Sequence, residues 1–322
     1  LHHIQDIQVV GSSDAIEHNQ HQHLAQFKGL GNQSNTTNPH LDTMKGKSIL
    51  DATIAFTVLQ LVLIMPQGVR DLVRWENRVL GGSYFTGILL VALPVFVIVV
   101  RRYEFRLMGV TVENWRKSVN NGFRGWLFFL APQFVMGFFM QWGLRYQDYP
   151  MLAAILSIIV LVACILMNRE MFDSASNRRL LVIGLIMVFP FMVSLGWNGF
   201  SLRMLKEYIW NILVGGFAEE FFYRGYVQSS VNQEYQREWK IGKTSFGPGL
   251  IVSAILYGVS RGVRVMKPWS GIYDFAWGWG LYAFTLGIFY GLIREASGDI
   301  LASGTANSMI DAIGEALQRA LG

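Results

Sequence analysis

The sequence predicts an all-α membrane protein, a polytopic bundle of eight or nine transmembrane helices. Of its 322 residues, 52% are hydrophobic and only 15% are charged, whereas a soluble domain carries about a quarter charged residues. Apolar runs of about 17 to 20 residues also recur along the chain. That is the length at which a helix crosses a hydrocarbon core of ~30 Å.

The apolar runs give the expected helices in order. The first six are strongly apolar and lie at residues 49–65, 84–100, 125–144, 151–167, 180–195 and 208–227. The later runs at 249–265, 275–293 and 300–320 are less hydrophobic. Lower hydrophobicity is typical of helices that contact protein and not lipid. We therefore expect 208–227, 249–265 and 300–320 to pack together at the centre of the bundle.

Residues 1–43 differ from the rest of the chain. They are rich in Asn, Gln and Ser and contain all six histidines. A segment of this composition cannot bury enough apolar surface to fold alone. We therefore expect a disordered tail at 1–43 followed by a transmembrane bundle at 44–322.

Composition and charge also bear on partners and location. The net charge is +5, but the basic residues lie in loops between apolar runs, so we expect no nucleic-acid partner. The loops on the N-terminal side hold more Lys and Arg than those on the other side, which predicts a cytoplasmic N-terminus. We expect the surroundings to be a lipid bilayer, the plasma membrane of a prokaryote.

The run at 208–227 carries three charges, Glu219, Glu220 and Arg224. An ionisable group at membrane depth is costly, so it usually faces the protein interior and marks a site. Glu220 and Arg224 lie four residues apart and share a helix face, which favours an ion pair. Glu219 points about 100° away and shares its face with Tyr223. The alternative is an ion pair that only holds helices together.

The pattern Glu-Glu-x-x-x-Arg in this position resembles the first motif of the CPBP family, also called Abi. That family includes the CAAX prenyl endopeptidases and bacteriocin-immunity proteins. The resemblance covers roughly 208–322. The family's second motif, Phe-x-x-x-His, corresponds to Tyr257 and Arg261, and its third, His-x-x-x-Asn, corresponds to Asn307 and Asp311. Each pair keeps the four-residue spacing that places two side chains on one helix face.

The resemblance implies that in proteolytic members a glutamate and histidines activate water while an asparagine stabilises the oxyanion. Here no histidine lies between residues 41 and 322. Arg261 has only donors and cannot accept a proton, and Asn307 does not titrate. Without His or Cys ligands a zinc site is not expected, and we predict no cofactor. Oxygen ligands from Glu219, Glu220 and Asp311 would instead suit Mg²⁺ or Ca²⁺.

A specific arrangement follows from these positions. We expect Glu219, Arg261 and Asn307 to lie in one cavity. We also expect Arg261 to hold Glu219 as a carboxylate through a bidentate pair.

Three functions are compatible with the sequence. The first is a catalytically degenerate CPBP-family protein that binds a membrane-protein partner, as a scaffold, an immunity or assembly factor, or an integral subunit. The second is a glutamate-dependent endopeptidase that cleaves prenylated or membrane peptides with Glu219 and Glu220 as its acid–base pair. The third is a transporter or lipid-binding bundle whose buried charges line a pathway.

Overall fold

The computed structural model describes residues 46–141, 150–167, 202–263 and 273–321, together with the single positions 266, 268 and 271. The tail expected at 1–43 and the helix expected at 180–195 lie outside these residues. The described chain is mainly helical, as its apolar runs predict, with one short hairpin of strands.

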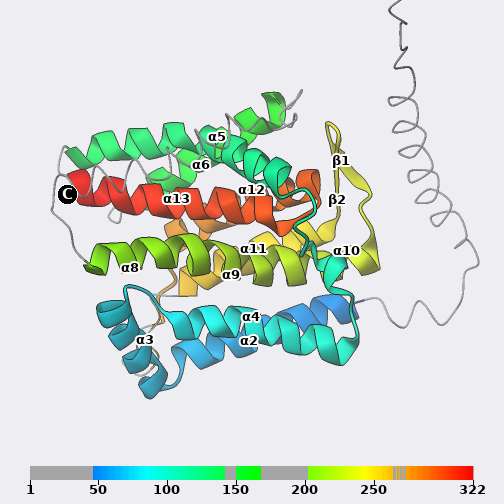
Figure 1. Ribbon diagram of the computed structural model, residues 1–322, viewed down its shortest axis with the longest axis horizontal. Helices are drawn as coiled ribbons and strands as arrows, with labels where there is room; N and C mark the ends of the chain where they lie inside the picture. The colour runs from blue at the N-terminus through cyan, green and yellow to red at the C-terminus, as the bar shows by residue number, and fades with distance from the viewer. Residues whose placement is uncertain are drawn as a thin grey trace, which may run out of the picture. The chain divides into compact units, whose positions relative to one another are not determined.

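A first pair of helices lies along one side of the bundle (Figure 1). These are α2 (Lys47–Ile64) and α4 (Tyr84–Arg101). Large apolar side chains such as Ile54 and Phe96 are exposed on their outer faces. Among the described residues, α2 and α4 are the helices long and apolar enough to cross a membrane. The expected number of eight or nine crossings stays a prediction.

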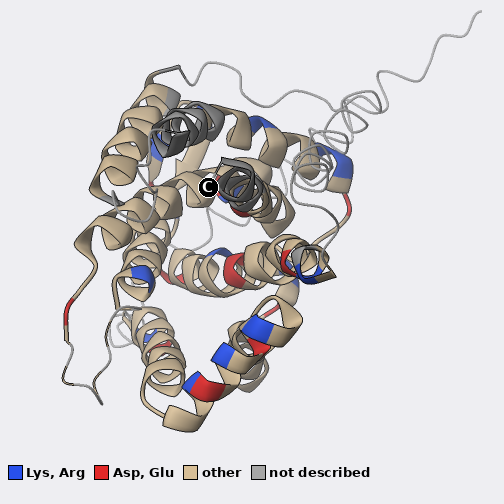
Figure 2. Cartoon of the chain, turned by 90° about the vertical axis from the view of Figure 1, so that its left-hand side faces the viewer, with Lys and Arg blue, Asp and Glu red and all other residues tan. Residues whose placement is uncertain are grey.

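Helix α3 (Gln67–Leu80) joins α2 to α4 and was not predicted. Its charges interrupt the apolar pattern that the prediction relied on. Figure 2 views the bundle from the end where α3 lies, and charged residues gather on that helix while the long helices are mostly uncharged. Gly81 ends the helix with φ of 78°, a left-handed conformation that favours glycine.

The opposite side of the bundle contains four further helices (Figure 1). They are α5 (Trp115–Gln141), α6 (Pro150–Met167), α12 (Trp277–Ser297) and α13 (Ile300–Leu321). A short 3₁₀ helix, η1 (Phe105–Met108), precedes α5. Helix α5 begins ten residues before the run expected at 125–144, so it also includes the basic residues Arg116, Lys117 and Arg124.

The charged motif lies between these two groups on one nearly continuous helical segment, which we call the motif helix. It comprises α8 (Leu202–Trp210), η3 (Asn211–Gly216), α9 (Phe217–Glu220), η4 (Phe221–Gln228) and α10 (Ser229–Tyr235). Helix α11 (Pro248–Gly262) follows after the hairpin of β1 (Trp239–Ile241) and β2 (Thr244–Phe246). Helix α11 packs against the motif helix and α12.

The motif helix runs from one end of the bundle to the other. Near its start, Lys206 Nζ donates to the carbonyl of Val79 at the end of α3, at 3.1 Å. Near its end, the Glu234 carboxylate accepts from the backbone N–H groups of Gly46 and, at 2.9 Å, Ser48 at the start of α2. Glu219 and Glu220 therefore lie about halfway along it.

The hairpin corrects the expectation of a purely helical chain. Ile241 pairs with Thr244, which leaves Gly242 and Lys243 as a two-residue turn. Gly242 has φ of 58°, and a positive φ at this place is typical of tight hairpin turns. Trp239 and Phe246 pack across the strands with ring centroids 5.6 Å apart. The strands are too short to show a clear alternating pattern in the sequence.

Small residues let the motif helix approach α13 closely. A Cβ at Gly216 would lie 2.0 Å from Ser308 Oγ and 3.0 Å from Ser308 Cα. The Ser308 hydroxyl donates to the carbonyl of Ile212 at 2.8 Å. Close backbone approach at small residues is typical of helix packing in membranes. It places α13 directly against the charged motif.

Candidate functional site

The glutamates of the motif lie on a short α-helical turn between two π-helical segments. Helix α9 (Phe217–Glu220) is preceded by η3 and followed by η4, both π-helical. A π-helical turn is wider than an α-helical one and is frequent at functional sites. The expected side-chain directions of Glu219 and Glu220 rested on 3.6 residues per turn throughout, so this change of helical type was not predicted.

Glu220 and Arg224 form a completely buried ion pair. Arg224 Nη1 lies 2.8 Å from Glu220 Oε1, and both side chains are 0% exposed. None of the guanidinium nitrogens of Arg224 makes a hydrogen bond within the described residues. Glu220 Oε2 also lacks a hydrogen-bond partner there. Asn307 Nδ2 donates to Glu220 Oε1 at 3.3 Å. The contact between Glu220 and Arg224 is thus mainly electrostatic.

Three tyrosine rings surround the Arg224 guanidinium. Its Cζ lies 4.5 Å from the ring centroid of Tyr257, 5.2 Å from that of Tyr290 and 5.7 Å from that of Tyr223. A cation over an aromatic face gains about 2 kcal/mol or more when it is desolvated. These rings replace part of the hydration that Arg224 loses on burial. The sequence analysis did not identify Tyr290 as part of the site.

Glu219 pairs with Arg261 on α11. Arg261 Nη2 lies 2.6 Å from Glu219 Oε2, with the two side chains 22% and 9% exposed. Tyr257 donates its hydroxyl proton to the same Glu219 oxygen at 3.2 Å and accepts from Arg261 Nη2 at 3.2 Å. The position of the second motif's histidine is therefore occupied by a permanent cation that contacts the first glutamate. The structure brings these two residues together as their sequence positions predict.

Two details differ from the expected arrangement. The Glu219–Arg261 contact runs through a single guanidinium nitrogen, Nη2, and not through a bidentate pair. Asn307 contacts Glu220, not Glu219, because the two neighbouring glutamates point to different sides of the motif helix. Asp311, one turn beyond Asn307 on α13, is half-buried and interacts electrostatically with Arg261.

The three carboxylates do not form a metal site. In the described parts of the chain, no group of three or more His, Cys, Asp or Glu side chains is arranged to hold a metal ion. The hypothesis of Mg²⁺ or Ca²⁺ bound by Glu219, Glu220 and Asp311 is therefore wrong for this conformation. Glu219 and Glu220 diverge, and each faces its own arginine.

Residues 201–313 match the family model described as type II CAAX prenyl endopeptidase Rce1-like. This segment contains both ion pairs and all three motif positions. The resemblance to the CPBP family is confirmed. No curated protein and no solved structure matched the chain. The Rce1-like family is embedded in membranes, and the two apolar helices α2 and α4 agree with that setting.

A cavity of about 420 Å³ reaches the CPBP motif from the side of α2, α3 and α4. Glu219 and Tyr223 line it, whereas Arg261 and Asn307 do not. This cavity therefore does not join Glu219, Arg261 and Asn307, and a cavity shared by all three stays a prediction. Asn307 is 1% exposed and lies behind Glu220. Of the three residues, Glu219 is the one that lines this cavity.

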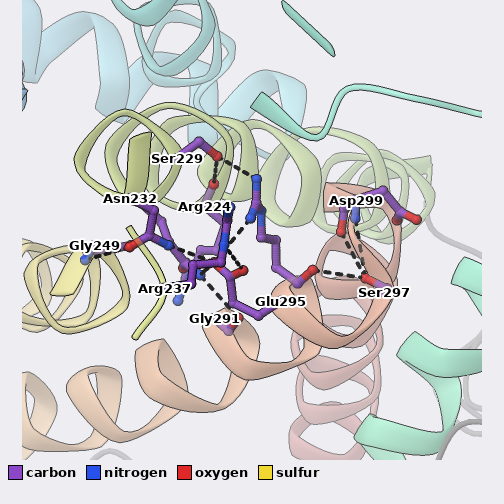
Figure 3. Close-up of polar contacts among 12 residues, drawn as sticks. Arg224, Ser229, Asn232, Arg237, Gly249, Gly291, Glu295, Ser297 and Asp299 are labelled. Carbon is purple, nitrogen blue, oxygen red and sulfur yellow. Dashed lines mark hydrogen bonds and ion pairs between the residues drawn. The ribbon is translucent and has the colours of Figure 1, made fainter. Parts of the chain in front are cut away.

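A second polar cluster lies toward the α10 end of the CPBP segment and was missed by sequence reasoning (Figure 3). Glu295 on α12 accepts from Gln228 at 2.7 Å and Asn232 at 2.8 Å on the motif helix. It also accepts from Arg237 at 2.6 Å and from Arg294 at 3.1 Å. The cluster could have been predicted from the adjacent charges Arg294 and Glu295, which lie near the end of an apolar run.

The cluster around Glu295 is structural. Its carboxylate has donors from two helices and from the segment before β1, so its charge is well compensated. Asn232 also accepts from the backbone N–H of Gly249 at the start of α11, at 2.9 Å. The cluster fixes α10, α11 and α12 together. The helices that carry Glu219 and Arg261 are thereby held in register.

Proposed function

We propose that this chain is an integral membrane protein of the CPBP type that has lost peptide-cleaving activity and acts by binding. It would serve as a scaffold, an immunity or assembly factor, or a subunit of a membrane complex. The bundle would cross the membrane eight or nine times with a cytoplasmic N-terminus, in a prokaryotic plasma membrane. Its partner would be another membrane protein.

One observation carries the proposal, the 2.6 Å contact between Arg261 and Glu219. A general base must be able to take a proton from water. Arg261 Nη2 donates to Glu219 Oε2 at 2.6 Å, so a charge-assisted hydrogen bond already occupies that oxygen. Arg261 itself cannot accept a proton. Arg261 therefore supports a structural and not a catalytic role for Glu219.

The competing function is a glutamate-dependent endopeptidase. The observation that favours it is the cavity, because Glu219 and Tyr223 line it and a substrate has a route to the carboxylate. Under this alternative Glu219 would still activate water, with Arg261 orienting it.

A cleavage assay distinguishes the two functions. Purified full-length protein in liposomes is incubated with prenylated and unmodified membrane peptides, and products are detected by mass spectrometry. We expect no product above that of protein-free liposomes. Peptide cleavage that is abolished by Glu219→Gln, while the melting temperature stays unchanged, would establish the endopeptidase instead.

A further inference from the structure

The cavity, which we call the channel, lies between α2, α3, α4 and the motif helix. On the motif helix its lining residues Trp210, Val214, Glu219 and Tyr223 recur every four or five positions, so they form one stripe. An α-helix would rise about 20 Å from residue 210 to residue 223 at ~1.5 Å per residue, and the wider π-helical turns of η3 and η4 make this stripe somewhat shorter. A ligand that fills this space is long and narrow.

The wall of the channel along α2 is mainly apolar, with Leu59, Leu63 and Ile64 beside Gln60. Helix α4 contributes Leu90 together with Gly87 and Thr86. A volume of about 420 Å³ is near the lower end of small-molecule pockets. This space suits one hydrocarbon chain, whereas a lipid with two chains would need more room.

The channel begins at α3 with donors that lack acceptors. Arg70 Nε and Trp210 Nε1 are both buried without a hydrogen-bond partner among the described residues, and both residues line the cavity. A buried donor without a partner costs about 1–3 kcal/mol. Two such donors in one cavity indicate a ligand that brings an acceptor.

The charge at this end of the channel favours an anion. Arg74 also lines the cavity, although it pairs with exposed Asp71 at 3.2 Å. The acidic lining residue is Glu219, whose charge Arg261 already balances. Helix α3 is amphipathic and joins the ends of two apolar helices, which is where lipid head groups lie.

We propose that the channel binds a single-chain amphiphile whose anionic head group is held by Arg70 and Trp210. Its hydrocarbon chain extends between α2, α4 and the motif helix toward Tyr223. A fatty acid supplies a carboxylate head group and a lysophospholipid a phosphate. This inference goes beyond the proposed function, because a lipid in the channel is a ligand distinct from the membrane-protein partner.

Binding is measured with the full-length protein in nanodiscs of neutral phosphatidylcholine. The probes are radiolabelled palmitate, palmitoyl lysophosphatidate and, as the uncharged comparison, monopalmitoylglycerol. We expect saturable binding of at least one anionic probe at about one molecule per chain, at least about tenfold tighter than the neutral probe. Binding of palmitate would indicate a site for a carboxylate head group, and binding of the lysophosphatidate a site for a phosphate.

Two variants test the head-group site. Arg70→Gln should weaken anion binding about tenfold, and Trp210→Phe should weaken it a few-fold, because each removes one donor. Arg78→Gln is the matched control, since Arg78 is an exposed arginine of α3 outside the cavity lining. It should bind like the wild type.

Equal affinity for neutral and anionic probes would overturn the inference, and so would an Arg70→Gln variant that binds as tightly as Arg78→Gln. If Arg70→Gln does not fold, the comparison of anionic and neutral probes on the wild-type protein still tests whether the channel prefers an anion. The same preparation is assayed for peptide cleavage, so the proposed function and the proposed amphiphile site are tested independently. Cleavage with specific anion binding overturns the proposed function, and absence of both cleavage and anion preference overturns the inference.

Discussion

Arg224 is a completely enclosed charge at the motif. Its guanidinium is fully buried, with one carboxylate beside it and three tyrosine rings around it. Removing one partner of a buried ion pair costs about 3–5 kcal/mol, because the other charge remains uncompensated. Arg224 therefore contributes to the integrity of the bundle whether or not the protein has an enzymatic function.

Tyr257 connects the two ion pairs, and its hydroxyl and its ring have separate roles. Tyr257→Phe should lower the free energy of unfolding by about 1.5–3 kcal/mol, because the hydrogen bond to charged Glu219 is lost. Tyr257→Leu should cost about 1–2 kcal/mol more, since the ring contact with Arg224 is also lost. Chemical unfolding of the detergent-solubilised variants measures both values.

Tyr273→Phe serves as the control, because Tyr273 is 68% exposed and should tolerate the change. If Tyr257→Phe unfolds like the wild type, the hydroxyl does not stabilise the Glu219–Arg261 pair. If Tyr257→Leu and Tyr257→Phe are equally stable, the ring contributes nothing to the burial of Arg224.

The end of α10 stabilises the start of α2. Helix α2 has no side-chain cap of its own, and Glu234 accepts from the Gly46 and Ser48 N–H groups instead. Burial, the largest single effect, raises the pKa of Glu234. The hydrogen bonds from Ser48, Gly46 and Lys47 together outweigh it, so the pKa lies below its ordinary value of 4.5.

This cap predicts a dependence of stability on pH. A carboxyl group whose pKa is lowered by folding stabilises the folded state above its unfolded pKa, and that contribution is lost as the pH falls through the folded value. Glu234→Gln should cost about 1 kcal/mol at neutral pH, the usual loss of a helix cap. The difference from the wild type should shrink below about pH 4.5, as thermal melts from pH 3 to 7 would measure.

Glu238→Gln is the comparison for Glu234, because Glu238 is exposed and has no cap contact. A Glu234→Gln variant whose deficit is the same at every pH would contradict the account of the cap. So would equal effects of the two substitutions.

The sequence predicted those elements whose signal is local. The run at 84–100 corresponds closely to α4, and the run at 300–320 to α13, because long apolar stretches can be recognised without knowledge of their neighbours. Helix α3 was missed because its charges hide an amphipathic pattern. The π-helical segments η3 and η4, which pack against α13 and α11, were missed because an apolar run does not distinguish a π-helical turn from an α-helical one.

The two ion pairs of the site could be predicted from the sequence, but the residues that surround them could not. The Glu220–Arg224 spacing and the CPBP-like positions of Glu219 and Arg261 lie in the sequence itself. That Asn307 would contact Glu220, and that Tyr290 would cover Arg224, depends on how α12 and α13 rotate about their axes. One sequence does not determine those rotations.

The bundle has two distinct ends, and the contacts between elements fix which segments share an end. The hydrogen bonds of Glu234 place the end of α10 beside the start of α2, and the hairpin follows three residues after α10. Helix α3 lies at the far end of α2, beside the start of α8. The hairpin and α3 should therefore face opposite sides of the membrane.

Cysteine labelling tests this topology. In a Cys164→Ser background, Lys240→Cys in the hairpin and Asp71→Cys in α3 are treated with an impermeant maleimide, in intact cells and after lysis. The basic loops on the N-terminal side predict that Asp71→Cys is labelled in intact cells and Lys240→Cys only after lysis. Labelling of both cysteines in intact cells would contradict the arrangement, whereas exchange of the two results would reverse only the orientation.

The central claim is that Arg261 holds Glu219 as a structural carboxylate, and a double-mutant cycle of Glu219→Gln and Arg261→Gln tests it most directly. Both side chains are less than a quarter exposed, so each single change should cost about 2–3 kcal/mol of unfolding free energy, somewhat below a fully buried pair. The double variant should lose less than the sum of the singles, with a coupling of about 1–2 kcal/mol. A coupling near zero, with both single variants as stable as the wild type, would contradict the claim.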